Sequence, residues 1–320
     1  MNAMNVLVTG GCGYKGHVLV PKLLQAGHQV TVLDKIWFGN FLEESDKLVV
    51  LKGDISLLDD IAFDGFDAVI HLASIANDPC GDLDPLLTWE TSCLATMQLA
   101  DKASRSGVSQ FIYASSGSVY GVKSELHVTE DLKLEPISEY NKTKMVSEKV
   151  LLSYADRMNV QIVRPATVCG VSPRMRFDVA VNMLVMQAVT RGEVTVFGGD
   201  QIRPNIHIDD ICDLYLYMLN NPHLVGVFNA GFENLSILEI AEMVRTHVDC
   251  KIKILDSIDP RTYRLDSSKL IKTGFVPRKS VSDAIQEIIN ALNSGILSDQ
   301  DCFHNLSWMK QNQLVGRLAA

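Results

Sequence analysis

This chain of 320 residues has no apolar run that approaches the 18 or more residues of a membrane-spanning helix. It also lacks an excess of basic residues, because 29 Lys and Arg face 38 Asp and Glu, a formal net charge of −9. Such a surface repels nucleic acids and anionic membranes, so we expect neither as a partner. The first residues carry no basic segment, and the run Val6–Thr9 is too short for a signal peptide, which favours a cytoplasmic protein.

Cysteines and histidines are not arranged in disulfide or metal-binding patterns. The seven cysteines are scattered and never spaced C-x-x-C, which is typical of buried thiols in a reducing cytosol. The eight histidines form no i, i+4 pair and no H-x-H cluster, so we predict no metal site. Repeats and low-complexity segments are missing as well, and 47% hydrophobic residues are ordinary for a folded globular chain.

The first half alternates short apolar runs with longer amphipathic stretches. Apolar runs without alternation predict strands that are buried on both faces, as in a parallel sheet. The predicted strands are Asn5–Thr9, Gln29–Asp34, Leu48–Leu51, Ala68–Leu72, Gln110–Ala114 and Val160–Val163. The predicted helices between them are Tyr14–Ala26, Pro85–Ser106 and Glu139–Met158. This order predicts an α/β fold with a doubly wound parallel sheet.

The second half is less regular and predicts a smaller α/β lobe. The predicted strands are Val194–Phe197, Val227–Ala230 and Lys251–Leu255, and the predicted helices are Ala180–Arg191, Asp209–Asn220 and Ser236–His247. Asp209 or Asp210 is expected to cap the middle helix, and Ser236 with Glu239 fits a capping box. We divide the chain into domains 1–165 and 166–320, with part of the later chain interleaved with the first domain.

A glycine-rich segment follows the first predicted strand. Gly10, Gly13 and Gly16 have G-x-x-G-x-x-G spacing directly before a predicted helix. The first two glycines let the backbone approach a pyrophosphate, and the third lets the helix pack on the strand. The helix N-terminus then holds the anion. The strand, the turn and the helix together predict a dinucleotide site.

Asp34 lies 18 residues beyond Gly16, at the end of the second predicted strand. A carboxylate there accepts hydrogen bonds from both adenosine ribose hydroxyls and repels a 2′-phosphate, which favours NAD over NADP. The alternative is that Asp34 only caps a turn. Asp54 and Ile55 end the third strand and are expected beside the adenine, although Asp54 is equally well interpreted as a loop aspartate. Lys15 is unusual at a helix start that is normally apolar; it either reaches solvent or adds charge near the phosphates.

Tyr140 and Lys144 lie four residues apart on a predicted helix, so their side chains share one face. A neighbouring ammonium and the positive nicotinamide ring both favour the phenolate, so we expect them to lower the pKa of Tyr140. The segment Ala114–Gly121 follows the fifth predicted strand and carries serines at its carboxyl end, where doubly wound sheets bind ligands.

With these motifs the chain resembles the extended short-chain dehydrogenase/reductases that act on nucleotide sugars. The resemblance extends to about residue 293 and is carried by Thr9–Gly16, His71–Ser74, Ser115–Gly121, Tyr140–Lys144, Arg164-Pro165 and Arg203–Asp210. It implies a Rossmann-type NAD domain, a nucleotide-sugar-binding lobe and a homodimer joined by a four-helix bundle. The bundle helices are those near 85–106 and 139–158.

The resemblance also implies roles for single residues. Tyr140 is the expected base, Lys144 binds the nicotinamide ribose, and Ser116 donates a hydrogen bond to the reacting sugar oxygen. The implied cofactor-binding residues are Gly10, Gly13, Tyr14, Lys15, Gly16, Asp34, Asp54, Ile55, Leu72, Ala73, Ser74, Tyr140, Lys144 and Pro165. The implied substrate-binding residues are Ser116, Ser118, Asn182, Arg203 and Arg261, with Arg174 and Arg176 as weaker candidates.

Departures from the family pattern narrow the expected reaction. The family's 4,6-dehydratases carry Asp-Glu where this chain has Gly117 and Ser118, and neither of these residues exchanges a proton near neutral pH. Dehydration is therefore disfavoured. Ser92, Ala95 and Cys169 replace the family's usual Asn, Gly and Tyr, which leaves the sugar open.

We therefore predict an NAD-dependent nucleotide-sugar 4-epimerase that acts through a 4-keto intermediate. If the keto sugar leaves, the enzyme is instead a 4-dehydrogenase that needs the same residues. A catalytically silent NAD-sensing protein is a further alternative, and an NADP-dependent 4-keto reductase is disfavoured by Asp34. The tail 299–320 carries no motif; its Leu306, Trp308 and Met309 favour packing on the body or on a partner, and a loose end is the alternative.

Overall fold

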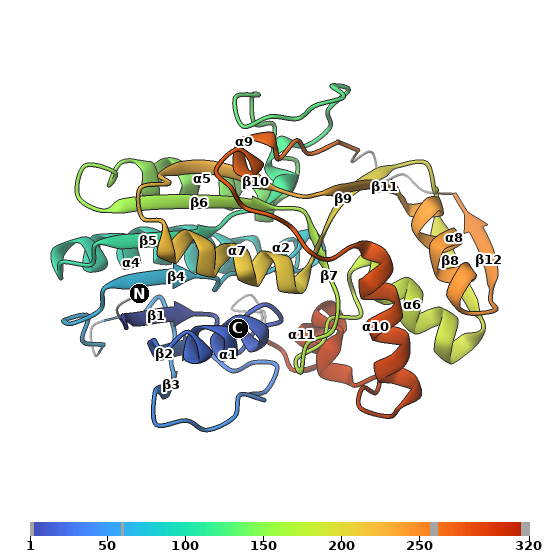
Figure 1. The fold of residues 1–320 in the computed structure, drawn as a ribbon, viewed down its shortest axis with the longest axis horizontal. Helices are drawn as coiled ribbons and strands as arrows, with labels where there is room; N and C mark the ends of the chain where they lie inside the picture. Colours follow the sequence, from blue (N-terminus) through green and yellow to red (C-terminus); the bar gives the residue numbers. More distant parts are fainter. Residues whose placement is uncertain (1–2, 59–60, 257–261, 315–320) are drawn as a thin grey trace.

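A seven-stranded parallel sheet forms the centre of the computed structural model, which describes residues 3–58, 61–256 and 262–314 (Figure 1). The strand order is β10-β6-β5-β4-β1-β2-β3, and every neighbouring pair is parallel. The strands are β1 (Asn5–Thr9), β2 (Gln29–Asp34), β3 (Leu48–Lys52), β4 (Ala68–His71), β5 (Gln110–Ala114), β6 (Asn159–Pro165) and β10 (Gly226–Ala230). The predicted doubly wound Rossmann-type sheet is confirmed. Within the described residues, no helix is long and apolar enough to cross a membrane.

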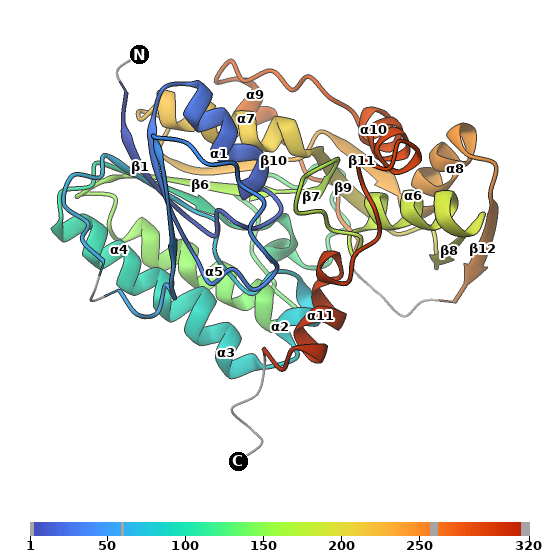
Figure 2. The same ribbon diagram turned by 90° about the horizontal axis from the view of Figure 1, so that it is seen from below.

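Helices cover both faces of this sheet (Figure 2). One face carries α1 (Gly16–Gln25) and α7 (Ile208–Asn220), and the other carries α3 (Pro85–Trp89), α4 (Ala95–Arg105) and α5 (Glu139–Leu152). Val6 and Val8 of β1 pack in the cluster with α1, whereas Leu7 packs in the cluster with α4. Side chains of a strand alternate between its faces, so an unbroken apolar run is the expected sequence for a strand covered twice.

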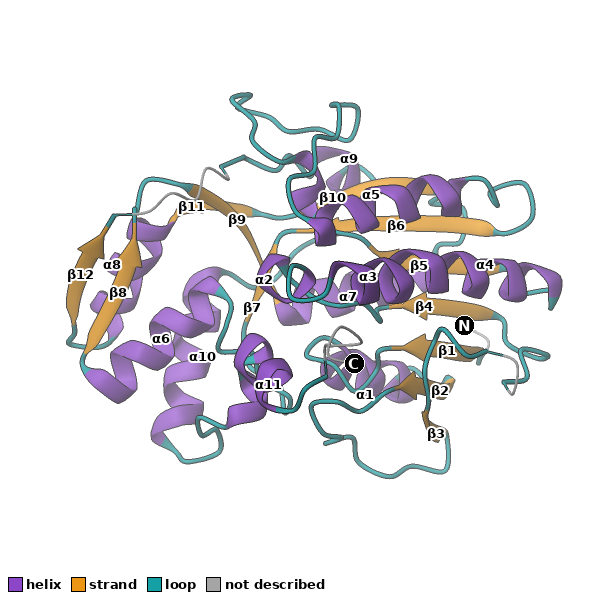
Figure 3. Ribbon diagram, turned by 180° about the vertical axis from the view of Figure 1, so that it is seen from behind, coloured by secondary structure: helices purple, strands orange, loops and turns teal. Residues whose placement is uncertain are grey.

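The smaller lobe lies beyond the carboxyl ends of the strands (Figure 3). It contains a three-stranded sheet of order β11-β9-β7 and a two-stranded sheet of β12 and β8. Its elements are β7 (Thr167–Cys169), α6 (Ala180–Arg191), β8 (Glu193–Phe197), β9 (Ile202–His207), β11 (Glu233–Ser236), α8 (Ile237–His247), β12 (Lys251–Leu255) and α10 (Val281–Asn293). Shorter helical turns are α2 (Asp78–Gly81), η1 (Glu90–Leu94), η2 (Gly117–Tyr120), α9 (Ser268–Ile271), η3 (Asp301–Phe303) and α11 (Asn305–Gln311). The later chain returns to the main sheet through α7 and β10.

The two helix caps expected in this half have different outcomes. Ser236 and Glu239 form the predicted capping box at the start of α8. The cap expected at Asp209 or Asp210 is wrong, because α7 is capped by His207, whose Nδ1 accepts from the backbone N–H of Asp209. Asp210 instead accepts hydrogen bonds from the backbone N–H groups of Arg278 and Lys279, at 2.9 and 3.0 Å.

The described part of the tail, residues 299–314, packs on the body, which is one of the three predicted alternatives. Trp308 on α11 donates from its indole Nε1 to the carbonyl of Trp37, at 2.7 Å. Met309 is buried in an apolar cluster with Ile75 and Cys80. The C-terminal helix thereby covers the loop that follows β2.

His17 on α1 is held in the neutral state by its neighbours. Its Nδ1 donates to the carbonyl of Gly13 at 3.0 Å, and its Nε2 accepts from the backbone N–H of Phe41 at 2.8 Å. Since an N–H group can only donate, Nε2 must carry no proton. Burial, the largest cause, lowers the pKa of His17 to about 4.

We expect acid to destabilise the fold through this histidine. Between pH 6.5 and 4, His17 binds a proton in the unfolded chain but not in the folded protein. The free energy of unfolding therefore falls as the pH drops through that window. In a His17→Asn variant, the loss of unfolding free energy between pH 6.5 and pH 4.5 should shrink by about 2 kcal/mol. Urea titrations of both proteins at the two pH values measure this; parallel losses would contradict the assignment.

Candidate functional site

The turn between β1 and α1 has no room for a side chain at Gly10 or Gly16. Gly10 has a φ of +74°, and a Cβ there would lie 2.6 Å from the backbone nitrogen of Ala73. A Cβ on Gly16 would lie 2.2 Å from the carbonyl oxygen of Gly11. The bare backbone and the N-terminus of α1 therefore face a cleft at the carboxyl ends of the strands, which is the cradle that a dinucleotide diphosphate needs.

Asp34 joins the end of β2 to this turn and also lines the cleft. Its two carboxylate oxygens accept from the backbone N–H groups of Cys12 and Ile36, at 3.0 and 2.7 Å. Burial raises the pKa of Asp34, and these two hydrogen bonds oppose the rise. Each oxygen keeps a lone pair for a further donor. Asp34 thus caps a turn and remains available to ribose hydroxyls, so the two sequence interpretations are compatible.

The cleft beside Asp34 has aromatic and cationic walls that the motifs do not indicate. Trp37 and Phe38 line it from the loop after β2, and Asn305 lines it from α11. The guanidinium carbon of Arg174 lies 4.2 Å from the ring centroid of Phe38, and its Nη2 donates to Asn305 at 2.5 Å. Trp37, Phe38 and Asn305 come from segments far apart in the sequence and carry no shared spacing, so only the fold reveals them. Arg174, a weaker substrate-binding candidate from the sequence, lies at this end of the cleft.

Asp54 differs from its expected place. Its carboxylate pairs with Lys35 at 2.7 Å and accepts from the backbone N–H of Ser56 at 2.9 Å. Its neighbours Gly53 and Ile55 line the cleft, whereas Asp54 does not. The loop-aspartate interpretation describes the side chain better than a direct cofactor contact.

Ser116, Tyr140 and Lys144 converge at the other end of the cleft. Ser116 follows β5, and its Oγ lies 2.7 Å from the Oγ of Ser118. Lys144 is buried and donates from Nζ to the carbonyl of Ala114 at 2.8 Å, and Nζ lies 5.8 Å from the ring centroid of Tyr140. The hydroxyl of Ser116 hydrogen-bonds Tyr140 and lowers its pKa. A hydroxyl, a phenol and an amine therefore face one space.

The electrostatics of Tyr140 differ from the sequence-based expectation. Burial first, and the Asp78 carboxylate second, raise the pKa of Tyr140 to about 12, while Ser116 and Arg176 oppose the rise. Lys144 contributes no lowering, because burial, helped by the charge of Lys15, lowers the pKa of the amine itself to about 7. Acidification of the phenol therefore requires positive charge brought into the cleft.

Asp78 is a site residue that the sequence reasoning missed. It begins α2, lines the cleft, and accepts hydrogen bonds from Ser138 at 2.5 Å and from the side-chain amide of Asn141 at 2.7 Å. Asn141 in turn accepts a hydrogen bond from Ser118. Asp78 thus fixes the start of α5 next to Tyr140. The tetrapeptide Asn77–Cys80 contains the helix-start pattern of a capping Asn and a proline at the second position, a signal that could have placed a turn here.

Some of the expected substrate-binding residues line the cleft and others do not. Arg203 lines the cleft, and Arg261 lies outside the described residues. Asn182 does not line the cleft. Both hydrogens of its side-chain amide are donated elsewhere, to the Tyr14 hydroxyl at 3.0 Å and to the carbonyl of Arg176 at 2.9 Å. Arg176 lines the cleft instead, in a two-hydrogen-bond pair with Asp178 at 2.8 and 3.1 Å.

Most of the predicted residues share this one cleft. The predicted site residues that line it are Gly10, Gly13, Tyr14, Lys15, Gly16, Asp34, Ile55, Leu72, Ala73, Ser74, Ser116, Ser118, Tyr140, Lys144, Pro165 and Arg203.

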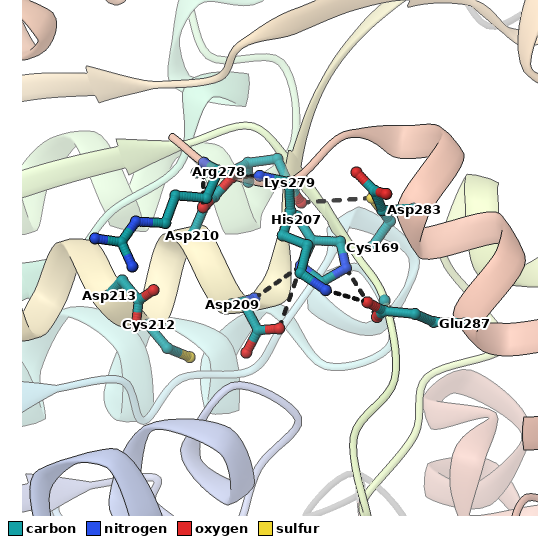
Figure 4. A network of polar contacts seen from close by, with 12 residues as sticks. Cys169, His207, Asp209, Asp210, Cys212, Asp213, Arg278, Lys279, Asp283 and Glu287 are labelled. Atoms are coloured by element: carbon teal, nitrogen blue, oxygen red, sulfur yellow. Dashed lines mark hydrogen bonds and ion pairs between the residues drawn. The ribbon is translucent and has the colours of Figure 1, made fainter. Parts of the chain in front are cut away.

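A second polar cluster lies at the joint between α7 and α10, where histidine spacing predicts nothing (Figure 4). Ligand atoms of His207, Asp209 and Glu287 lie within 4.8 Å of one another. Their charges are already matched: Glu287 accepts from His207 Nε2 at 3.1 Å and pairs with Lys279, and Asp209 pairs with Lys22 at 3.1 Å. The cluster therefore connects α7 with α10, and both of its carboxylates are already paired with lysines.

We expect Asp34→Ala to reduce the preference for NAD over NADP at least about tenfold. A carboxylate beside a 2′-phosphate repels it, and its loss leaves Arg174, whose charge already interacts with Asp34, to attract the phosphate. Titration of both nucleotides by calorimetry measures the ratio. Asp101→Ala on α4 is the matched control, because that carboxylate pairs with Arg105 and lies outside the cleft lining. An unchanged ratio in Asp34→Ala would mean that Asp34 only caps the turn.

Comparisons with known proteins agree with this geometry. A family model described as the NAD dependent epimerase/dehydratase family matches residues 6–231. The UDP-glucose 4-epimerase of Lactobacillus helveticus is 29% identical over 269 residues, covering 75% of this chain and 82% of that protein. The UDP-glucuronic acid decarboxylase 1 of Arabidopsis thaliana is 26% identical over 317 residues, covering 93% of this chain and 72% of that protein.

A solved structure shows the same fold over nearly the whole chain. The UDP-glucuronic acid 4-epimerase of Bacillus cereus, in complex with UDP-glucuronic acid and NAD, has a TM-score of 0.79 and 28% identity. The match covers 91% of this chain and 99% of that one. Together with the family match over well more than half of the sequence, this shows that the chain is an enzyme of the NAD-dependent epimerase/dehydratase family and that NAD is its cofactor.

Proposed function

We propose that the chain interconverts nucleotide sugars as a 4-epimerase, through a 4-keto sugar. The observation that carries this proposal is the convergence of Ser116, Tyr140 and Lys144 at one end of the cleft whose other end holds Asp34. Bound NAD supplies the hydride acceptor and donor of such a reaction. Relatives that act on UDP-sugars support a nucleoside diphosphate sugar as the substrate.

The protein side of this chemistry is the handling of one proton. Tyr140 takes the proton of the C4 hydroxyl and returns it to the new hydroxyl, and Ser116 donates a hydrogen bond to the oxygen while it carries charge. The raised pKa of free Tyr140 fits a group that becomes a base only after a cation joins it, because an oxidised nicotinamide ring favours the phenolate. Arg203 and Arg176 line the cleft as the cations for an anionic substrate.

Two features favour epimerisation over water loss. Gly117 and Ser118 stand next to Ser116 and cannot act as an acid–base pair at neutral pH. Asp78, which also lines the cleft, accepts hydrogen bonds from Ser138 and Asn141 at the start of the Tyr140 helix. Among the described residues, Tyr140 is therefore our choice for the proton transfer that oxidation and its reversal need.

The test is a product assay with purified protein and single UDP-sugars. UDP-glucose, UDP-galactose, UDP-glucuronic acid and UDP-galacturonic acid are incubated separately with NAD, and the nucleotides are resolved by chromatography. The proposal expects the C4 epimer of one of these sugars without net NADH. Stoichiometric NADH with a released keto sugar would favour a 4-dehydrogenase, and a cofactor-bound protein inert to all of them would favour an NAD sensor.

We further propose that the protein is a homodimer joined through α4 and α5. These helices lie side by side on the outer face of the sheet (Figure 2). Apolar side chains remain exposed along these helices: Met97 on α4 by 41%, Leu152 at the end of α5 by 40%, and Leu94, the last residue of η1 before α4, by 45%. Exposed apolar side chains on paired helices are typical of an interface. Light scattering should give twice the chain mass for the wild type and the single mass for Met97→Glu; a monomeric wild type would refute the dimer.

A further inference from the structure

Lys15 is a cation inside the glycine turn, at the position where α1 begins. Its side chain runs across to α7, where Nζ lies 3.3 Å from the hydroxyl of Tyr215 and 5.7 Å from the centroid of that ring. Its carbonyl accepts from the thiol of Cys212 on the same helix, at 3.4 Å. The amine is therefore fixed in place on a wall of the cleft, and it does not extend into bulk solvent.

In the described part of the chain, Lys15 has no counter-ion, unlike Lys22 and Lys35. Lys22 on the same helix pairs with Asp209 and Asp213, and Lys35 pairs with Asp54. In the part of the chain that the structure describes, no carboxylate lies within ion-pair distance of Lys15 Nζ. Burial lowers the pKa of Lys15 to about 8, so the amine is largely protonated at neutral pH. The cleft thus contains an uncompensated positive charge.

The charge acts at the catalytic end of the cleft. Lys15 lowers the pKa of Lys144, as the second cause after burial. Its side chain extends to α7, which packs against β5, the strand that Ser116 follows, whereas Asp34 ends β2 on the opposite side of β1. A different cation, Arg174, lies at the adenosine end of the cleft, near Asp34 and Phe38. Lys15 is therefore directed toward the catalytic pair and away from the ribose carboxylate.

We propose that Lys15 sets the redox balance of the bound cofactor by disfavouring the oxidised nicotinamide, which carries a positive charge, relative to the reduced ring, which carries none. An unpaired cation in a partly dry cleft repels the first form and leaves the second unaffected. Disfavouring the oxidised ring makes hydride transfer from the substrate to the cofactor more favourable. It therefore increases the fraction of the enzyme that holds the keto sugar. A lysine that served only the diphosphate would act equally on both forms, because the diphosphate is the same in both. The inference rests on the proposed catalytic end of the cleft.

Lys15→Met tests this, because methionine keeps the apolar stem and removes the charge. After removal of copurified nucleotide, the dissociation constants of NAD and NADH are measured by calorimetry at pH 7. The ratio of the NAD constant to the NADH constant should fall about tenfold in the variant. A tenfold change in this ratio corresponds to about 30 mV in the reduction potential of the bound couple. Lys15→Arg, which keeps the charge, should retain the wild-type ratio.

Two further variants make the result decisive. Lys35→Met removes a cleft lysine that is neutralised by Asp54, so both constants should change by the same factor. Lys15→Gln repeats the test if the methionine variant fails to fold in a melting experiment. Equal weakening of NAD and NADH in the Lys15 variants would assign the amine to the diphosphate, and an unchanged pair of constants would make it structural; either result overturns the proposal. Because nucleotide binding needs no sugar, a failure of the proposed 4-epimerase activity would be recognised separately.

Discussion

Replacing Tyr140 with phenylalanine is expected to lower turnover of the accepted nucleotide sugar by about 10³-fold and to leave NAD binding within a small factor of the wild type. Phenylalanine keeps the ring that packs near Lys144 and deletes only the oxygen. Loss of a positioned general base costs about 10²–10⁴ in rate. Chromatographic rates, with cofactor affinity measured in parallel, test the expectation.

The control for this variant is Tyr154→Phe, which makes the same change at the far end of the α5 region. The Tyr154 ring is partly buried in the apolar cluster under α4, away from the cleft. Its loss of a hydroxyl should leave turnover unchanged. Full activity in Tyr140→Phe would remove the phenol from the mechanism.

The parts of the fold that the sequence predicts are those that follow from local rules. Residues Val6–Val8 of β1 are apolar without alternation because both faces of the sheet are covered. The Ser236–Glu239 pair satisfies the first N–H groups of α8 by itself. The glycine turn is equally local, because a side chain at Gly10 or Gly16 would collide with backbone. Such constraints are visible in a few consecutive residues.

The elements that the sequence does not predict depend on distant partners. β9, which contains Arg203, becomes a strand because β7 and β11 lie on its two sides. The cap of α7 falls to His207, since Asp210 is drawn away to the backbone before α10. No pattern within these segments reports either neighbour.

The same distinction explains the candidate site. Tyr140 and Lys144 could be paired from helix spacing alone, and Asp34 from its place at a strand end. Whether a polar side chain is free to bind a ligand depends on its neighbours in the folded structure. The side-chain amide of Asn182, for example, donates a hydrogen bond to the Tyr14 hydroxyl. The part of the expected lowering of the Tyr140 pKa that Lys144 was to supply is absent for a similar reason: burial, which the sequence does not show, raises the pKa of the phenol and lowers that of the amine.

Breaking a buried ion pair beneath α5 is expected to destabilise the fold strongly. Arg164 on β6 binds Glu148 on α5 through two nitrogens, at 2.9 and 2.6 Å, and donates to the Tyr120 hydroxyl at 2.6 Å. Both charged side chains are at most 5% exposed. Burial disfavours the Arg164 cation, but Glu148 outweighs it and holds the pKa of Arg164 above its usual value. The pair lies one helical turn beyond Lys144.

Glu148→Leu is therefore expected to lower the free energy of unfolding by about 3–5 kcal/mol, because it leaves a buried guanidinium without its carboxylate. Removing both partners, in Glu148→Leu with Arg164→Met, should cost less than the single change, since no unpaired charge remains. Asp101→Ala, which breaks the exposed Arg105–Asp101 pair on α4, should change stability by less than about 0.5 kcal/mol. Urea unfolding of the four proteins measures all three differences. If Glu148→Leu is as stable as the wild type, Arg164 must find water or another acceptor. The expected loss of stability, with partial recovery in the double variant, would show that this ion pair holds α5, and with it Tyr140 and Lys144, against the sheet.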